Sequence, residues 1–374
     1  MADPIVNEQA ARRIPVAKPW ITDAEKDAVR RVLDSGWISG GPEVERFEAA
    51  IAGAHGGRHG VACNSGTTAL HLALRAVGVH EGSLVLLPTM TMVAVANAVL
   101  YCGARPIFAD SDFLCGNPSA ADVDRYAPLC HAAVIPHLYG APAHEAVKAA
   151  RRSSGSLWII QDCAEAHYAR IPEPDKLTLL AFSFYANKII TSGGEGGMVA
   201  TQCDEIAGRL RRLRAHAFTP GDHFNHDELA YGYRMTDVQA AFGTAQHERH
   251  AEIIARREAL AKWYACVLSD VSSVVPFVAP ENLRMRGGVP WVFPVLARDE
   301  ATMHTARRML AENGVDTRRF FKPLHRQKHL ARYVESGQRF DVADDLYSRG
   351  FYLPLFPELT DDDVAYVAAV LRAV

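Results

Sequence analysis

Short, continuous apolar runs recur along this chain, with helical patterns between them. The runs span residues 84–87, 106–109, 132–136, 157–161, 179–184 and 198–201. They do not alternate apolar with polar residues, so each predicts a strand that is buried on both faces. Such strands, separated by helices, are typical of a mostly parallel sheet covered on both sides. The sequence therefore predicts an α/β fold built around a sheet of this kind.

Apolar residues at helical spacing, such as Val44, Phe47 and Ile51, predict helices between the strands. The predicted helices are 43–53, 67–77, 93–101, one long stretch from 237 to about 268, 302–313 and 361–371. A chain of 374 residues is long for a single core. We therefore expect a large α/β domain over residues 1–250. A smaller α+β domain over 251–374, with a strand at 291–296, should follow it.

Charge and composition narrow the class of protein. A net charge of −3 and a pI near 6.6 argue against nucleic-acid and membrane-surface partners. Seven scattered cysteines without a C-x-x-C pair favour core residues in a reducing compartment. The first residues lack a signal-peptide pattern, and the most apolar window is too short to span a bilayer. The sequence thus predicts a cytoplasmic protein, and no metal site is expected.

Lys188 lies between a predicted strand and a glycine-rich run at 191–197. Upstream, the apolar stretch that begins at Trp158 ends on the carboxylate of Asp162. Pyridoxal 5′-phosphate (PLP) needs such a pair, because the amine forms the Schiff base and the carboxylate pairs with the pyridinium nitrogen. A lone lysine is usually a solvated surface group, and a strand-end Asp often caps the next helix. The spacing of several such motifs favours the PLP site.

The segment Asn64-Ser-Gly-Thr-Thr68 opens the predicted helix 67–77. Hydroxyl groups, a glycine and free helix N-terminal amides together bind an anion such as a phosphate well. The alternative is an ordinary capped helix, with Ser65 or Thr67 as the N-cap. Glu165 follows Asp162 by three residues and can reach the phenolic oxygen of the cofactor.

Ordered motifs along nearly the whole chain resemble the DegT/DnrJ/EryC1/StrS family of PLP-dependent sugar aminotransferases, and within it the perosamine-synthase branch. The motifs include Asn64-Ser-Gly-Thr-Thr68, His137-Leu-Tyr-Gly140, Asp162-Cys-Ala-Glu-Ala-His167, Phe182-Ser-Phe-Tyr-Ala-Asn-Lys188, Tyr231-Gly-Tyr-Arg-Met-Thr236 and Arg318-Arg-Phe-Phe-Lys-Pro-Leu-His325. The resemblance implies the aspartate-aminotransferase-like fold type I. It also implies an obligate homodimer with shared active sites, glutamate as amino donor and a nucleotide-linked keto-sugar as acceptor.

The resemblance also implies roles for single residues. Lys188 matches the Schiff-base lysine, Asp162 the pyridinium partner, and Glu165 the residue near the phenolic oxygen. Further cofactor contacts are implied for Gly66, Thr67 and Ser183 at the phosphate, for Arg234 from the partner subunit, and for Met92 at the ring face. Substrate contacts are implied for His325, Tyr185 and Glu195. Met92 departs from the family, because an aromatic residue usually stacks on the ring there.

Three functions remain open from the sequence. The first is an aminotransferase that moves an amino group from glutamate to a nucleotide-linked keto-6-deoxy sugar, with perosamine-type 4-amination favoured. The second is an aminotransferase acting on a non-nucleotide cyclic ketone in natural-product biosynthesis, which the altered pocket residues allow. The third is a PLP-binding regulatory protein. The intact pair of Asp162 and Lys188 disfavours the third, since a sensor needs no electron sink.

Overall fold

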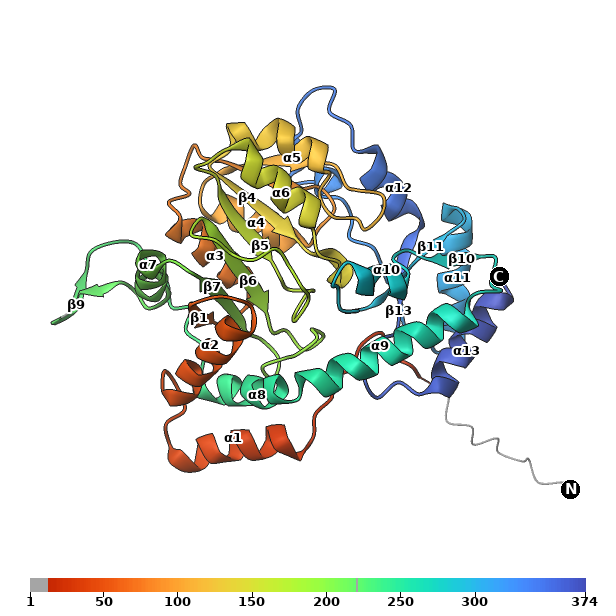
Figure 1. Ribbon diagram of the computed structural model, residues 1–374, viewed down its shortest axis with the longest axis horizontal. Helices are drawn as coiled ribbons and strands as arrows, with labels where there is room; N and C mark the ends of the chain where they lie inside the picture. Colours follow the sequence, from red (N-terminus) through yellow and green to blue (C-terminus); the bar gives the residue numbers. More distant parts are fainter. Residues whose placement is uncertain (1–12, 220) are drawn as a thin grey trace, which may run out of the picture.

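A seven-stranded sheet forms the centre of the protein in this computed structural model, which describes residues 13–219 and 221–374 (Figure 1). The strand order is β1-β7-β6-β5-β4-β2-β3. The strands are β1 (His59–Cys63), β2 (Leu84–Pro88), β3 (Arg105–Ala109), β4 (Ala132–Pro136), β5 (Trp158–Asp162), β6 (Thr178–Ser183) and β7 (Gly197–Thr201). Neighbouring strands are parallel except at β7, which is antiparallel to both β6 and β1.

The six predicted apolar runs all form strands of this sheet, each within one residue of its expected ends. Their continuous apolar character follows from cover on both faces. Val85 and Leu87 point into one hydrophobic cluster, whereas Leu86 between them points into another. Helices α3 and α4 lie on the first face, and α5 and α6 on the second. The predicted α/β class is confirmed.

The helices of this part of the chain are α1 (Asp23–Ser35), α2 (Pro42–Ala54), α3 (Gly66–Ala76), α4 (Val93–Tyr101), α5 (Ala120–Tyr126), α6 (His144–Ser153), α7 (Asp204–Arg214) and α8 (Asp237–Glu248). Strands β8 (Phe218–Thr219) and β9 (Asp222–His226) form a separate two-stranded sheet that projects from the body (Figure 1). Neither α1 nor β1 was predicted from the sequence.

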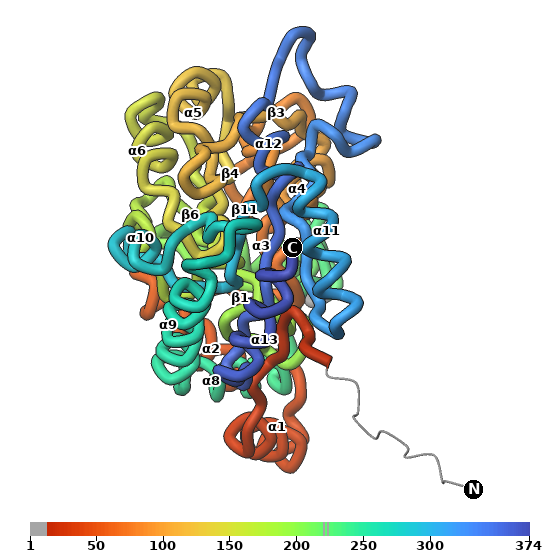
Figure 2. The backbone as a smooth tube through the Cα atoms, turned by 90° about the vertical axis from the view of Figure 1, so that its right-hand side faces the viewer, coloured from red at the N-terminus to blue at the C-terminus, as the bar shows by residue number. Residues whose placement is uncertain are grey.

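The expectation of one long helix after Thr236 is wrong, because the stretch divides into α8 and α9 (His250–Val267). Arg249 separates them with φ −101° and ψ 7°. Its guanidinium donates to the buried Glu25 of α1 at 2.9 Å, so the break coincides with an ion pair between distant segments. Helix α1 packs against α8 on the outside of the large part of the protein (Figure 1, Figure 2).

A second, four-stranded antiparallel sheet forms the smaller C-terminal part, in the order β10-β11-β13-β12. Its elements are β10 (Val274–Pro276), α10 (Pro280–Met285), β11 (Phe293–Ala297), α11 (Glu300–Glu312), β12 (Arg318–Arg319), α12 (Asp341–Arg349), β13 (Gly350–Leu353) and α13 (Asp361–Arg372). Helices α9, α11 and α13 share one hydrophobic cluster with this sheet. Ile14 joins the same cluster. A division at residue 250 stays a prediction.

Within the described ranges no helix is long and apolar enough to cross a membrane.

The large and small parts of the protein meet along a tight backbone contact. Gly140 accepts a hydrogen bond from the amide of Val289 at 3.2 Å and has φ +86°. A Cβ atom on Gly140 would lie 1.7 Å from the Val289 carbonyl oxygen. Only glycine fits at this close approach.

We expect Gly140→Ala to lower the free energy of unfolding by at least about 2 kcal/mol, through the left-handed backbone and the clash. Gly155→Ala is the matched control, because Gly155 is exposed and has no atom within 4 Å of an added Cβ. Urea unfolding followed by tryptophan fluorescence measures both variants. Equal midpoints for the two variants would contradict the argument.

Candidate active site

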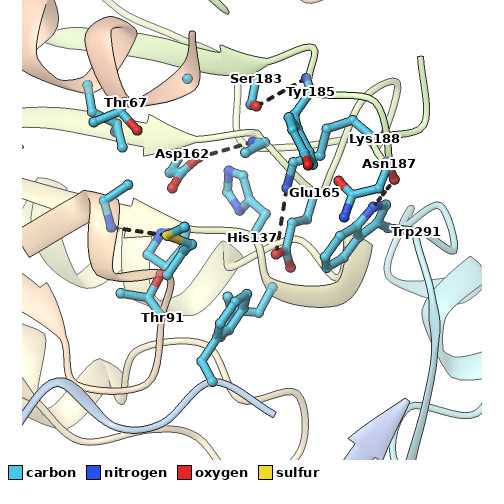
Figure 3. A pocket seen from close by; sticks show the side chains of 18 of the residues that line it. Thr67, Thr91, His137, Asp162, Glu165, Ser183, Tyr185, Asn187, Lys188 and Trp291 are labelled. Atoms are coloured by element: carbon cyan, nitrogen blue, oxygen red, sulfur yellow. Dashed lines mark hydrogen bonds and ion pairs between the residues drawn. The ribbon is translucent and has the colours of Figure 1, made fainter. Parts of the chain in front are cut away.

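A cavity of about 330 Å³ opens at the carboxyl edge of the large sheet (Figure 3). The ends of β4, β5 and β6 and the start of α3 supply most of its lining, as expected for an α/β sheet. The small part of the protein contributes Trp291, Phe321 and Tyr352. Nine predicted site residues come together here, namely Gly66, Thr67, Met92, Asp162, Glu165, Ser183, Tyr185, Lys188 and Glu195.

Asp162 ends β5, where it pairs in register with Pro136 of β4 and Ala181 of β6. Its side chain is buried, and Oδ1 accepts one hydrogen bond, from the amide of Ala164 at 3.1 Å. Burial raises the pKa of this carboxyl, and the charge of Lys188 opposes the rise. A buried carboxylate with so few partners is unfavourable unless a cation pairs with it. A pyridinium ring nitrogen is such a cation.

Lys188 and Glu165 face each other across the cavity (Figure 3). The Nζ atom of Lys188 lies 4.0 Å from Oε1 of Glu165, and the two side chains are 13% and 7% exposed. The other carboxylate oxygen of Glu165 accepts from the amide of Tyr139 at 2.8 Å. Burial raises the pKa of Glu165 to about 7, against the effect of the lysine charge. Glu165 can therefore gain or lose a proton near neutral pH.

The start of α3 forms a cradle for an anion. Ser65 caps the helix by accepting from the amide of Thr68, while the first amides of the helix have no intrahelical partner. A Cβ on Gly66 would lie 2.5 Å from Cβ of Ser183, and one on Gly197 would lie 2.1 Å from the carbonyl oxygen of Ser65. At both glycines the neighbouring atoms leave no room for a side chain, so the backbone at the start of α3 packs directly against the ends of β6 and β7. These donors suit a phosphate, so the residues present fit PLP.

Three other predicted residues line the cavity more loosely. Met92 and Tyr185 are 48% and 46% exposed in the single chain. The Met92 sulfur accepts from the amide of Ala94 at 3.1 Å, which turns its side chain back along α4. Glu195 is exposed, and partial desolvation of its carboxyl raises its pKa.

Two predicted site residues lie outside the cavity lining. Arg234 is exposed, and its backbone forms an isolated bridge with Cys63. His325 places Nδ1 2.7 Å from the hydroxyl of Thr89 and Nε2 3.3 Å from Asp344, and its ring stacks on Phe340. Both ring nitrogens are therefore engaged by the protein. Contacts of Arg234 and His325 with cofactor or sugar stay predictions.

Several lining residues were not singled out as site residues from the sequence. His137 is buried and accepts from the amide of Ala143, and its Nε2 lies 3.0 Å from Gln161. Burial lowers the pKa of His137 to about 3, so its imidazole is neutral. Its motif, His137-Leu-Tyr-Gly140, could have identified His137 as a lining residue from the sequence. Trp291 gave no comparable signal, because it belongs to an ordinary apolar segment far along the chain.

A parallel sheet with one antiparallel strand, whose carboxyl edge presents a lysine, a buried aspartate and an anion cradle, defines a PLP-dependent enzyme of fold type I. The chain belongs to the DegT/DnrJ/EryC1/StrS aminotransferase family, whose family model matches residues 19–372. The resemblance noted from the motifs is confirmed. Aminotransferases of this family depend on PLP, and so does this chain.

Similar proteins match over nearly their full length. The chain is 36% identical to a GDP-perosamine synthase of Caulobacter vibrioides, covering 97% of this chain and 98% of that protein. It is 35% identical to a GDP-perosamine synthase of Escherichia coli O157:H7, covering 95% and 96%. Among solved structures, the aminotransferase TlmJ from Streptoalloteichus hindustanus superposes with a TM-score of 0.87 at 29% identity, covering 96% of this chain and 98% of that chain.

We expect Asp162→Asn to slow the half-reaction with glutamate by at least about a hundredfold, because the amide keeps the shape but loses the charge. Cofactor should still bind through the cradle. Stopped-flow absorbance of the loaded enzyme measures the half-reaction. Asp270→Asn, which removes a surface carboxylate, serves as the control. A half-reaction in Asp162→Asn as fast as in the control would assign the role to another residue.

Proposed function

We propose that this protein transfers an amino group from glutamate to a nucleotide-linked keto-6-deoxy sugar, with 4-amination of the perosamine type. The observation that carries the proposal is the joint presence of Lys188, Asp162 and the α3 cradle around one cavity. The full-length similarity to GDP-perosamine synthases supports the choice of sugar. We further propose that the enzyme works in the cytoplasm.

In this proposal Lys188 is the Schiff-base lysine and Asp162 holds the pyridinium nitrogen protonated. When bound, PLP supplies an electron sink for the carbon that carries the amino group. Lys188, once free, moves a proton to and from that carbon. Glu165 lies near enough to Nζ, at 4.0 Å, to stabilise the charged amine, and its pKa of about 7 allows it to change protonation. Thr67 and Ser183 would donate to the phosphate.

The two other functions are less well supported. A cyclic ketone without a nucleotide is compatible with the cavity, but the full-length relatives above are named for a nucleotide-linked product. A regulatory role has no support from the site. The desolvated side chain of Asp162, which accepts one hydrogen bond in the described chain, is suited to stabilising a charged ring during chemistry.

The direct test offers glutamate and a panel of keto-sugars to the PLP-loaded enzyme and identifies the products by mass spectrometry. The panel should include GDP-linked and UDP-linked 4-keto-6-deoxy sugars and nucleotide-free cyclic ketones. We expect a product with one amino group from the GDP-linked sugar, and none with Lys188→Ala. Amination of the nucleotide-free ketones alone would favour the second function.

We also propose a homodimer with shared active sites, in which Arg234 reaches the cofactor phosphate of the partner subunit. A guanidinium offers charge-assisted hydrogen bonds to a phosphate. Arg234 is exposed, and its side chain has no hydrogen bond or ion pair within residues 13–219 and 221–374. Met92 and Tyr185 at the cavity mouth are also exposed, and a second chain would cover them.

Mixed dimers test this arrangement. If Lys188→Ala and Arg234→Ala are each inactive, dimers with one copy of each should regain up to about half of the activity, since one of two shared sites carries neither defect. Differently tagged chains allow the mixed dimers to be purified and assayed. Arg234→Lys is the control that keeps a charge. Verified mixed dimers without activity would place Arg234 in the site of its own subunit, or outside both sites.

A further inference from the structure

Trp291 joins the small part of the protein to the lysine of the large part. Its indole lines the cavity and is 3% exposed. The Nζ atom of Lys188 lies 4.4 Å from the centre of the ring. The indole N–H donates to the backbone carbonyl of Asn187 at 2.8 Å (Figure 3). One side chain therefore contacts both the amine of Lys188 and the backbone just before it.

A buried arginine donates a hydrogen bond to the backbone of Trp291. Arg257 of α9 is 3% exposed and donates through Nη1 to the carbonyl oxygens of Trp291 at 2.8 Å and Leu355 at 3.0 Å. The Trp291 ring also contacts Tyr352, with the ring centres 5.9 Å apart. A buried guanidinium has no water to replace these carbonyls, so the contacts hold the backbone at Trp291 and Leu355. The backbone and one ring contact of Trp291 thus come from the small part, and its N–H is bonded to the large part.

The surroundings of the Lys188 amine show what the indole does. Glu165 at 4.0 Å and the Trp291 ring at 4.4 Å attract the charge, and neither distance is that of a direct hydrogen bond. The face of an indole is the best aromatic partner for an ammonium group, above all in a desolvated site. The contact with the indole face also does not fix the direction of any N–H group of the amine. The amine is held in place, and within residues 13–219 and 221–374 no hydrogen bond engages the N–H groups that would transfer a proton.

We propose that Trp291 is a positioning residue that holds the free Lys188 amine in the cavity while the lysine is not bonded to the cofactor. The inference rests on the proposed role of Lys188 as the Schiff-base lysine. If Trp291 only filled the boundary between the two parts, its loss would reduce stability but leave the location of the amine unchanged. The two roles differ in a measurement on the amine itself.

The first measurement uses the full-length chain freed of cofactor, with its eight lysines reductively methylated with ¹³C. Lys188→Arg assigns the Lys188 signal. We expect this signal to be displaced upfield by the indole ring current, and to move to the range of exposed lysines in Trp291→Leu. Trp158→Leu is the control, because Trp158 begins β5 at the end opposite to Asp162. A Lys188 signal at the same position in wild type and Trp291→Leu would overturn the proposal.

The second measurement is kinetic. We expect Trp291→Leu to lower kcat about tenfold or more with little change in the KM for glutamate, since the lost attraction acts on the lysine and not on the substrate. Trp158→Leu should retain kcat. The proposal would also be overturned if kcat is unchanged in Trp291→Leu although the Lys188 signal has moved to the range of exposed lysines.

A third variant covers the case in which Trp291→Leu does not fold. Trp291→Phe removes the N–H that bonds Asn187 but keeps an aromatic face. Because that face remains beside the amine, most of the upfield displacement of the Lys188 signal should remain. A Lys188 signal in the exposed range in that variant would overturn the proposal. Borohydride reduction of the loaded enzyme, followed by peptide mapping, tests the premise separately. Label on another lysine would remove the proposed role of Lys188, whatever the resonance shows.

Discussion

Two buried carboxylates, Asp162 and Glu165, interact with one partly buried lysine, Lys188, and desolvation raises the pKa of both acids. Lys188 alone cannot neutralise two negative charges, so the cavity favours a further cation or a protonated acid. A pyridinium beside Asp162 and a proton on Glu165 both answer this need. The charge imbalance therefore favours a cationic ring beside Asp162, while the amides of α3 favour an anion in the same cavity. PLP carries both groups.

The sheet makes this arrangement possible because parallel strands end at a common edge. Asp162 and Ser183 close adjacent strands, and the amides of α3 approach Ser183 because residue 66 is a glycine. The small part of the protein completes the site from the opposite side with Trp291. Its backbone approaches the large part closely where Gly140 meets Val289. The surroundings of Lys188 therefore come from both parts.

The sequence predicted the features that local patterns encode. Continuous apolar runs gave the strands, and a lysine before a glycine run and an aspartate at a strand end gave the two central site residues. Features that depend on distant segments could not be predicted. The break at Arg249 coincides with an ion pair to Glu25, more than two hundred residues away. The contacts of His325 could not be predicted either, because its partners Thr89 and Asp344 have no sequence signal in common.

Met92 lies on an open side of the cavity in the single chain. An aromatic residue at this position would cover one face of a planar ring, whereas the Met92 side chain is half exposed and bonded back to Ala94. Tyr185 at the same cavity is similarly exposed. Proton transfer at a carbon benefits from the exclusion of water, and a flexible thioether adapts to whatever surface covers it. The open face of the cavity therefore supports the proposal that a second copy of the chain closes the site, with Met92 as the adaptable contact.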